Sequence, residues 1–184
     1  MPVDDDTAFA RLVSLACHDL RTPLATIVGF ARTLARIADL DPQAARWVGL
    51  IDGAAGELDA LIDVLAIAAR IERGDYDPPR NATPVADLVD AGTPEGVTHL
   101  DEGATRMALA ALLRAAERHG KGTAPAWRAN GRELLLGPLA RDAVGIVAGD
   151  EQRDVGALVA RRVLTALGAT AELRGDDLVV ALPD

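Results

Sequence analysis

The chain has 184 residues and a formal net charge of −9, and this acidic balance argues against nucleic-acid or anionic-membrane partners, which call for a basic face. Its hydrophobic fraction is 49%, but aromatic residues make up only 3%, which favours helices packed through small residues over an aromatic-rich β-sandwich. A chain of this length can form two small domains, each with its own core.

No stretch of the sequence predicts a membrane segment. No apolar run approaches the roughly 20 residues that a spanning helix needs, and the acidic start Met-Pro-Val-Asp-Asp-Asp is unlike a basic signal peptide. Cys17 has no second cysteine with which to form an internal disulfide. These features predict a soluble, cytoplasmic protein.

The first predicted element is a helix from about residue 7 to about residue 38. Acids and a hydroxyl in residues 4–7 suit a helix start. Apolar residues then recur at spacings of four and three, which predicts a seam packed against other helices at a shallow angle: Val13, Cys17, Leu20, Leu24, Ile27, Ala31, Leu34 and Ala38. Pro23 lacks the amide hydrogen that would bond the carbonyl of Asp19, so we expect a bend there.

A second long helix is predicted after a short turn, with Asp41 as its N-cap and Pro42 at its first position. It carries two neighbouring apolar stripes and stops at Gly74. Two antiparallel helices cover only part of so wide an apolar surface, so the hairpin is expected to pair with a second copy. The predicted architecture of this half is therefore a four-helix bundle formed by a homodimer.

The second half predicts a separate α+β domain. Residues 75–84 contain three prolines, so we expect domains at 1–75 and 85–184 with a linker at 76–84. The predicted elements are a short helix at 85–89, a strand at 96–100, helices at 105–118 and 155–167, a helix-like stretch at 138–148, and hairpins at 126–136 and 169–182. The turn of the first hairpin is expected at Asn130-Gly131. Helices packed on a small sheet form an α+β sandwich.

The clearest chemistry lies in residues 14–24, S-L-A-C-H-D-L-R-T-P-L. On a helix, Arg21 and Thr22 follow His18 by three and four residues, so the imidazole, guanidinium and hydroxyl lie along one side. A neutral imidazole attacks phosphorus readily, and the carboxylate of Asp19 can fix its tautomer. Phosphoryl transfer needs mainly alignment and charge neutralisation. The stretch therefore predicts a phosphate-accepting histidine.

The other candidate ligands are isolated. His99 and His119 are expected to be structural or exposed, and no group of His, Cys, Asp or Glu has metal-ligand spacing. We therefore expect neither a cofactor nor a metal on this chain.

The string from His18 to Leu24, H-D-L-R-T-P-L, resembles the H-box of sensor histidine kinases, and residues 58–74 resemble the end of their dimerisation and histidine-phosphotransfer hairpin. The resemblance covers residues 7–75. It implies that His18 is phosphorylated, that Asp19 orients or deprotonates the imidazole, that Arg21 lies near the phosphoryl oxygens, and that Thr22 can hold a water for dephosphorylation.

The order of elements in the second half resembles the ATP-binding domain of these kinases, but its nucleotide motifs are missing. The helix that in the family carries asparagines for magnesium and ATP has none here, because the asparagines of the chain are Asn81 and Asn130. Residues 142–146 lack both glycines of the Asp-x-Gly-x-Gly loop, and residues 154–157 keep one glycine of the Gly-Leu-Gly-Leu motif. This implies a degenerate ATP-binding-like domain without useful ATP affinity.

Such a chain resembles the dimeric histidine phosphotransferases of multistep phosphorelays, which derive from sensor histidine kinases. The resemblance implies that His18 shuttles a phosphoryl group between aspartates of response-regulator receiver domains, with magnesium bound only by the receiver. Three alternatives stay open: a response-regulator phosphatase that uses Thr22, a diverged kinase that still binds ATP, and a non-catalytic dimeric scaffold.

Overall fold

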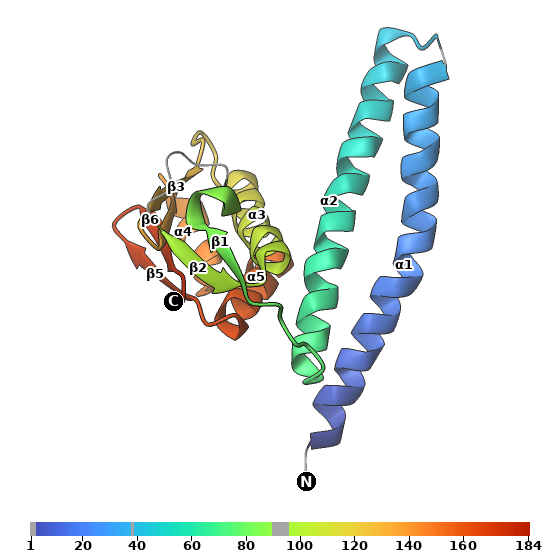
Figure 1. The fold of residues 1–184 in the computed structure, drawn as a ribbon. Coiled ribbons are helices and arrows are strands. Elements are labelled where there is room, and N and C mark those ends of the chain that lie inside the picture. The colour runs from blue at the N-terminus through green and yellow to red at the C-terminus, as the bar shows by residue number, and fades with distance from the viewer. Residues whose placement is uncertain (1–2, 38, 90–95) are drawn as a thin grey trace. The chain divides into compact units, whose positions relative to one another are not determined.

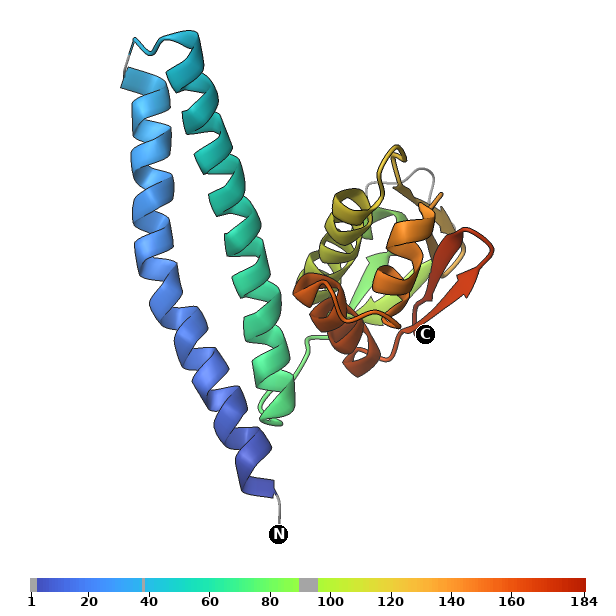
Figure 2. The same ribbon diagram turned by 180° about the vertical axis from the view of Figure 1, so that it is seen from behind.

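The computed structural model describes residues 3–37, 39–89 and 96–184. These residues belong to two compact units, Met1–Arg73 and Gly74–Asp184, which Figures 1 and 2 draw from opposite sides. The first unit is all helical and the second mixes helices with antiparallel strands. The division falls two residues before the predicted end of the first domain at residue 75.

Helix α1 spans Val3–Ile37 and forms one arm of a hairpin (Figure 1). It begins about one turn before the predicted start near residue 7. It also continues through Pro23 without ending, so the proline removes one helical hydrogen bond without breaking the element.

Helix α2 spans Pro42–Glu72 and forms the other arm. The side chain of Asp41 caps it by accepting hydrogen bonds from the amides of Gln43 at 2.9 Å and Ala44 at 3.0 Å. Pro42 needs no such partner because it has no amide hydrogen. Both residues occupy their predicted positions.

Only part of the predicted seam packs inside the hairpin. The buried residues of α1 recur every seven positions: Ala10, Cys17, Leu24 and Ala31. Three of the five buried residues of α2 show the same spacing: Ala55, Ile62 and Ala69. Leu20, Ile27 and Leu34, which alternate with the buried set, keep 50%, 49% and 45% of their surface exposed. The hairpin therefore buries one narrow stripe and leaves a second one uncovered.

The uncovered stripe lies on one side of the hairpin, which we call the apolar face. Exposed large hydrophobic residues gather on it from both helices: Phe9, Leu12, Leu20, Ile27, Phe30, Leu34, Trp47, Leu50 and Leu58. At about 100° of rotation per residue, Ile27 and His18 point to opposite sides of α1. The side that carries His18 is called the His18 face below.

The main sheet of the second unit has four antiparallel strands in the order β3-β4-β6-β5. These strands are β3 (Ala126–Asn130), β4 (Glu133–Gly137), β5 (Thr170–Arg174) and β6 (Asp177–Ala181). Helices α3 (Glu102–His119), α4 (Arg141–Ala148) and α5 (Val155–Ala166) pack against this sheet (Figure 2). The core lies between the layers, where alternate strand residues are fully buried: Leu134, Leu136, Leu178 and Val180.

A smaller two-stranded sheet corrects the predicted linker. Strand β1 (Asn81–Pro84) pairs antiparallel with β2 (Val97–Leu100), and the short 3₁₀ helix η1 (Val85–Leu88) follows β1. Residues 81–84 are therefore structured, whereas the sequence predicts a linker through residue 84. The prolines indicated irregular backbone, but Pro84 lies at the last position of an edge strand, where a proline is tolerated.

One hairpin turn also differs from its prediction. Asn130 still pairs with Glu133, so the two-residue loop consists of Gly131 and Arg132 rather than Asn130 and Gly131. Gly131 has φ 58°, a left-handed conformation that glycine adopts without steric cost. The glycine was identified correctly, and its place within the turn was one residue off.

Candidate functional site

His18 lies near the middle of α1, one position past the buried Cys17. Its side chain is 81% exposed, so both faces of the imidazole are open to a partner. The neighbouring Cys17 and Leu24 pack in the hairpin core with Ala55 and Ile62. His18 therefore faces solvent, while the neighbouring residues of α1 pack against α2.

The contact with Asp19 favours one tautomer of the His18 imidazole. The Nδ1 atom of His18 lies 3.1 Å from Oδ1 of Asp19. An ionised carboxylate can only accept a hydrogen bond, so this contact favours the tautomer with the proton on Nδ1. The lone pair then resides on Nε2, which is the nitrogen available as a nucleophile.

Arg21 contacts α2 rather than His18. Its Nη2 atom donates to Oδ1 of Asp63 at 2.5 Å, which links the two helices one turn from His18. Sequence reasoning singled out Arg21 but missed Asp63. The available signal was a row of acids on one side of α2 at spacings of seven and four residues: Asp52, Asp59 and Asp63.

Thr22 is exposed and lies four residues after His18, so its hydroxyl is on the same side of α1. Its carbonyl accepts a hydrogen bond from Oγ1 of Thr26 at 3.1 Å. The structure therefore places His18 and Asp19 in direct contact, and it places Arg21 and Thr22 on the next turn of the same helix.

The buried thiol of Cys17 is no competitor for phosphate. Burial raises its pKa, although the nearby charge of Arg21 acts in the opposite direction. A thiol with a raised pKa stays protonated at neutral pH and is a poor nucleophile.

A groove of about 540 Å³ runs along the His18 face from Arg21 toward the turn of the hairpin. Small residues from both helices, Ala25, Gly29 and Gly56, leave it shallow. Three arginines of α1 line it: Arg21, Arg32 and Arg36. Aspartates of α2 pair with Arg21 and Arg32, and Asp59 of α2 also lines the groove, so its charges are mixed.

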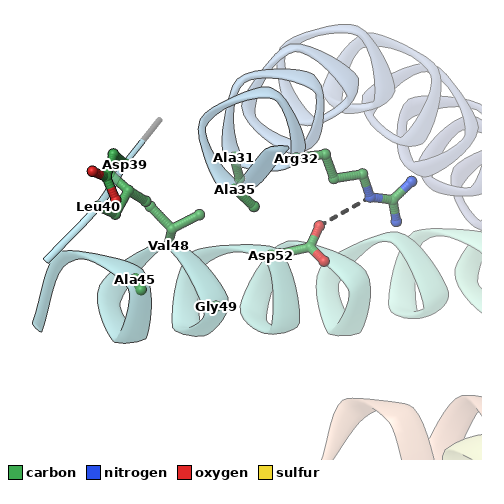
Figure 3. A pocket seen from close by; sticks show the side chains of 9 residues that line it. All are labelled: Ala31, Arg32, Ala35, Asp39, Leu40, Ala45, Val48, Gly49 and Asp52. Carbon is green, nitrogen blue, oxygen red and sulfur yellow. Dashed lines mark hydrogen bonds and ion pairs between the residues drawn. The ribbon is translucent and has the colours of Figure 1, made fainter. Parts of the chain in front are cut away.

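A second hollow of about 320 Å³ lies at the turn end of the hairpin (Figure 3). Nε of Arg32 donates to Oδ1 of Asp52 at 3.1 Å across the two helices. Arg32 lines both hollows, so the open surface continues along the hairpin. Small residues line much of the second hollow: Ala31, Ala35, Ala45 and Gly49.

In the second unit, the segments at the place of the expected nucleotide motifs are helical and partly buried. Ala115 and Ala116 of α3 are each 1% exposed. Residues 142–146 are part of helix α4 rather than a loop, and Ala143 and Ile146 are 0% and 3% exposed. Asp142 is exposed, so one side of α4 faces solvent.

Asp154 occupies the start of α5, where the expected glycine motif would meet phosphate. Its Oδ1 atom accepts from the amide of Ala157 at 2.9 Å, and its Oδ2 atom accepts from Arg118 at 2.7 Å and contacts Nε2 of His119 at 3.2 Å. Burial alone would raise the pKa of Asp154, but these hydrogen bonds and the charge of Arg118 lower it overall. A carboxylate thus already satisfies the donors that an anion would use.

Comparison with known proteins agrees with the geometry of the hairpin. Residues 10–74 match the family model described as His Kinase A (phospho-acceptor) domain. The helical hairpin is a phospho-acceptor domain. The sensor histidine kinase TrcS of Mycobacterium tuberculosis (strain ATCC 25618 / H37Rv) is 34% identical over 74 residues, which are 40% of this chain and 14% of that protein. The homology to sensor histidine kinases therefore concerns a small part of the relative.

The fold resembles that of a solved histidine kinase over nearly the whole chain. The crystal structure of full-length ShkA in complex with AMPPNP matches with a TM-score of 0.55 and 20% sequence identity, over 94% of this chain and 45% of that one. The phospho-acceptor domain is thus followed by a histidine kinase-like α/β unit, and the chain spans less than half of the solved relative.

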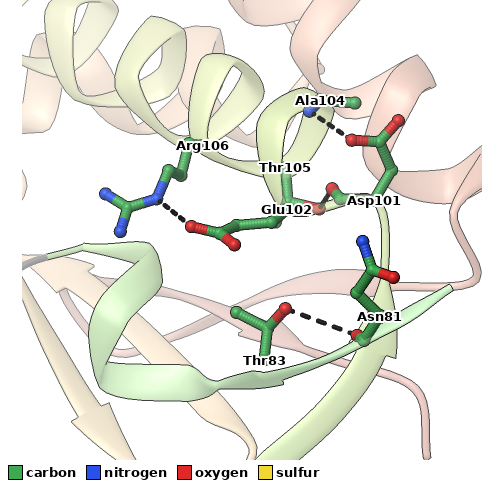
Figure 4. Close-up of polar contacts among 7 residues, drawn as sticks. All are labelled: Asn81, Thr83, Asp101, Glu102, Ala104, Thr105 and Arg106. Atoms are coloured by element: carbon green, nitrogen blue, oxygen red, sulfur yellow. Dashed lines mark hydrogen bonds and ion pairs between the residues drawn. The ribbon is translucent and has the colours of Figure 1, made fainter. Parts of the chain in front are cut away.

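The polar groups at the start of α3 form hydrogen bonds within the second unit (Figure 4). Oδ1 of Asp101 accepts from the amide of Ala104 at 2.9 Å, and its Oδ2 accepts from the hydroxyl of Tyr76 at 2.8 Å. The hydroxyl of Thr83 donates to the carbonyl of Asn81 at 3.3 Å. Asn81 is the first residue of β1, and Asn130 is the last residue of β3. Neither asparagine is on α3.

The described residues include neither a metal-binding cluster nor a membrane-spanning helix. Within the described ranges, no three or more His, Cys, Asp or Glu side chains form a group that could hold a metal ion. None of the helices in these ranges is long and apolar enough to cross a membrane.

Replacing Asp154 by alanine is expected to lower the free energy of unfolding of the second unit by about 2–4 kcal/mol. The change removes a helix cap and the hydrogen-bond partner of Arg118 and His119. Because folding lowers the pKa of Asp154, its contribution is fully present above the ordinary aspartate pKa of about 3.9 and is lost as the pH falls through the lower folded value. Urea unfolding between pH 7 and pH 2 measures both effects.

The control is Asp142→Asn, which changes an exposed acid in the first turn of α4. It should alter the unfolding free energy by no more than about 0.5 kcal/mol. If Asp154→Ala and Asp142→Asn change the free energy of unfolding by the same small amount, the cluster around Asp154 does not stabilise the unit.

Proposed function

We propose that this chain is a dimeric histidine phosphotransferase that carries phosphoryl groups between receiver domains of response regulators. It shares its phospho-acceptor domain with histidine kinases, so the distinction rests on the second unit. The observation that carries the proposal is that residues 142–146 form part of helix α4 rather than a glycine-rich loop, and that α3 carries no asparagine. These segments therefore lack the loop and the amide side chains that would hold a nucleotide and its magnesium.

The transfer chemistry follows from the geometry of His18 and Asp19. The lone pair on Nε2 attacks the phosphorus of an aspartyl phosphate on the receiver, a P–N bond forms, and the acyl-phosphate P–O bond breaks. The receiver aspartate leaves as a carboxylate, and the Nδ1 proton stays shared with Asp19, which stabilises the cationic ring. The reverse sequence transfers the phosphoryl group to a second receiver. Magnesium would be bound by the receiver.

The groove beside His18 supports docking of a protein partner. Phosphoryl transfer between two proteins requires an accessible histidine and a surface that aligns the donor. A floor of small residues gives a receiver an approach of suitable depth. The arginines of α1 along it can turn from their aspartate partners on α2 toward an anionic phosphorylated site, because exposed ion pairs are weak.

The apolar face supports the dimer. Contiguous exposed hydrophobic residues of this extent mark an interaction surface in most proteins. Because His18 lies on the opposite side of α1, a second hairpin can cover the apolar face and leave the histidine open. The result is a four-helix bundle.

The test is to mix the purified chain with a receiver domain that carries radioactive phosphate on its aspartate. We expect label to appear on the chain in an acid-labile form, as a phosphoramidate bond requires, and to pass to a second receiver. Loss of receiver phosphate without any label on the chain would instead support a phosphatase, for which the exposed Thr22 is the residue to change. If nothing is transferred or lost, a scaffold role remains.

An active kinase is the second candidate, and the fold similarity to a kinase crystallised with AMPPNP favours it. The same chain incubated with magnesium and radioactive ATP distinguishes the two. We expect no incorporation from ATP. Incorporation that depends on His18 would replace the phosphotransferase proposal with a kinase.

A further inference from the structure

We propose that Asp63 is a positioning residue that holds Arg21 away from His18 and thereby controls how strongly this arginine attracts an incoming phosphoryl group. The inference rests on the proposed role of His18 as phosphoryl acceptor. It concerns a residue on α2, the helix that does not carry the histidine. Asp63 would act through Arg21 and touch no reacting atom.

The geometry gives Arg21 two alternative partners. Residues three apart on a helix have neighbouring side chains, so the guanidinium of Arg21 can reach a phosphoryl group on His18. In the structure it is bound instead to Asp63 at 2.5 Å. The side chains are 45% and 36% exposed, so both are free of the packing that would lock them in place.

The charges favour an exchange of partners when phosphate arrives. A phosphoryl group at neutral pH carries between one and two negative charges and three acceptor oxygens, whereas Asp63 carries one charge. An exposed ion pair is weak and easily rearranged. Arg21 is therefore held by Asp63 in the resting protein and shared with the phosphoryl group during transfer.

A second interhelical pair provides an internal comparison. Arg32 and Asp52 make the same kind of contact at 3.1 Å. Asp52 lies eleven residues before Asp63 on α2, which is about 16 Å along the helix. Asp52 thus bridges the helices in the same way, but its arginine is three turns further from His18 than Arg21 is.

The experiment uses phosphoramidate as a small donor, so no receiver is needed. Nε2 of His18 attacks phosphorus, the P–N bond of the donor breaks, and ammonia leaves with the protons it already carries. Because Asp63→Asn releases Arg21, we expect the rate constant of His18 phosphorylation to rise about two- to fivefold, the range that a weak exposed pair allows. The rate is measured by ³¹P NMR on the full chain.

The controls separate positioning from a change in charge or stability. Asp63→Glu should keep the wild-type rate because it can still bind Arg21, and Asp52→Asn should also leave the rate unchanged. In the Arg21→Gln background, adding Asp63→Asn should have no further effect. Circular dichroism checks that each variant retains its helices.

An unchanged or slower rate of His18 phosphorylation in Asp63→Asn overturns the inference. A rate increase by Asp63→Asn that persists in the Arg21→Gln background also overturns it. A gain shared by Asp52→Asn would show a general effect of net charge and would also overturn it. These outcomes are independent of receiver transfer. The phosphotransferase proposal can therefore fail while Asp63 retains this role, and the reverse also holds.

Discussion

Replacing His18 by glutamine is expected to abolish transfer of phosphate from a phosphorylated receiver to the protein. Glutamine has a similar size and keeps polar atoms near Asp19, but its amide nitrogen has no available lone pair to attack phosphorus. We expect the acid-labile label to fall at least about a thousandfold, to the level without protein, as loss of a nucleophile does in covalent catalysis. Gel autoradiography after a short incubation measures it.

His99→Gln is the matched control. His99 is exposed on β2 and faces Ala82 in the register of the small sheet, so its removal should leave both the fold and the label intact. His119 is less suitable because it contacts Asp154. Label that survives in His18→Gln and disappears in His99→Gln would place the acceptor in the second unit and contradict the proposed mechanism.

The cluster around His18 could be singled out from sequence because its residues are close together in the chain. His18, Asp19, Arg21 and Thr22 lie within five consecutive positions, and helical spacing alone places them on adjoining turns. Asp63 could not be predicted in the same way. It is 42 residues from Arg21 in the chain, and the register between the two helices decides which of several acids on α2 meets the arginine.

The start of α2 followed from its cap, whereas the division of the apolar seam did not follow from the sequence. Asp41 was identified as the N-cap from its residue type. Cys17, Leu20 and Leu24 all fit a repeat of three and four residues. Which of them faces α2 depends on the contact between the helices, because the sequence is apolar on two adjacent sides of α1.

In the second unit, strands that pair with a neighbouring segment were predicted, whereas strand β1, which pairs with a distant segment, was not. The hairpin containing Gly131 was found because a left-handed glycine marks a turn. Strand β1 was missed because its partner β2 begins 13 residues after β1 ends, and the four residues of β1 include a proline and no large apolar side chain. Pairing with a distant segment made a strand of residues whose composition indicated a linker.

Ile27 lies within the apolar face and is 49% exposed. Replacing it by aspartate is expected to weaken the proposed dimer at least about a hundredfold. Each copy loses roughly 1.5–3 kcal/mol of hydrophobic burial, and each would place an unpaired charge in the interface. Because twofold symmetry applies the change twice, a loss of about 3 kcal/mol is the lower bound, and 1.4 kcal/mol corresponds to a factor of ten. Sedimentation equilibrium across a range of concentrations measures the dissociation constant.

Ala25→Asp is the matched control, because it introduces the same charge two residues earlier on the His18 face. If the apolar face forms the dimer, Ala25→Asp remains dimeric and Ile27→Asp does not. Dissociation by Ala25→Asp alone would place the interface over His18, and then no receiver could reach the imidazole in the dimer. The pair of variants therefore tests both the interface and the accessibility on which transfer depends. Circular dichroism of Ile27→Asp shows whether the separated hairpin keeps its helices, which pack through the narrow stripe from Ala10 to Ala31.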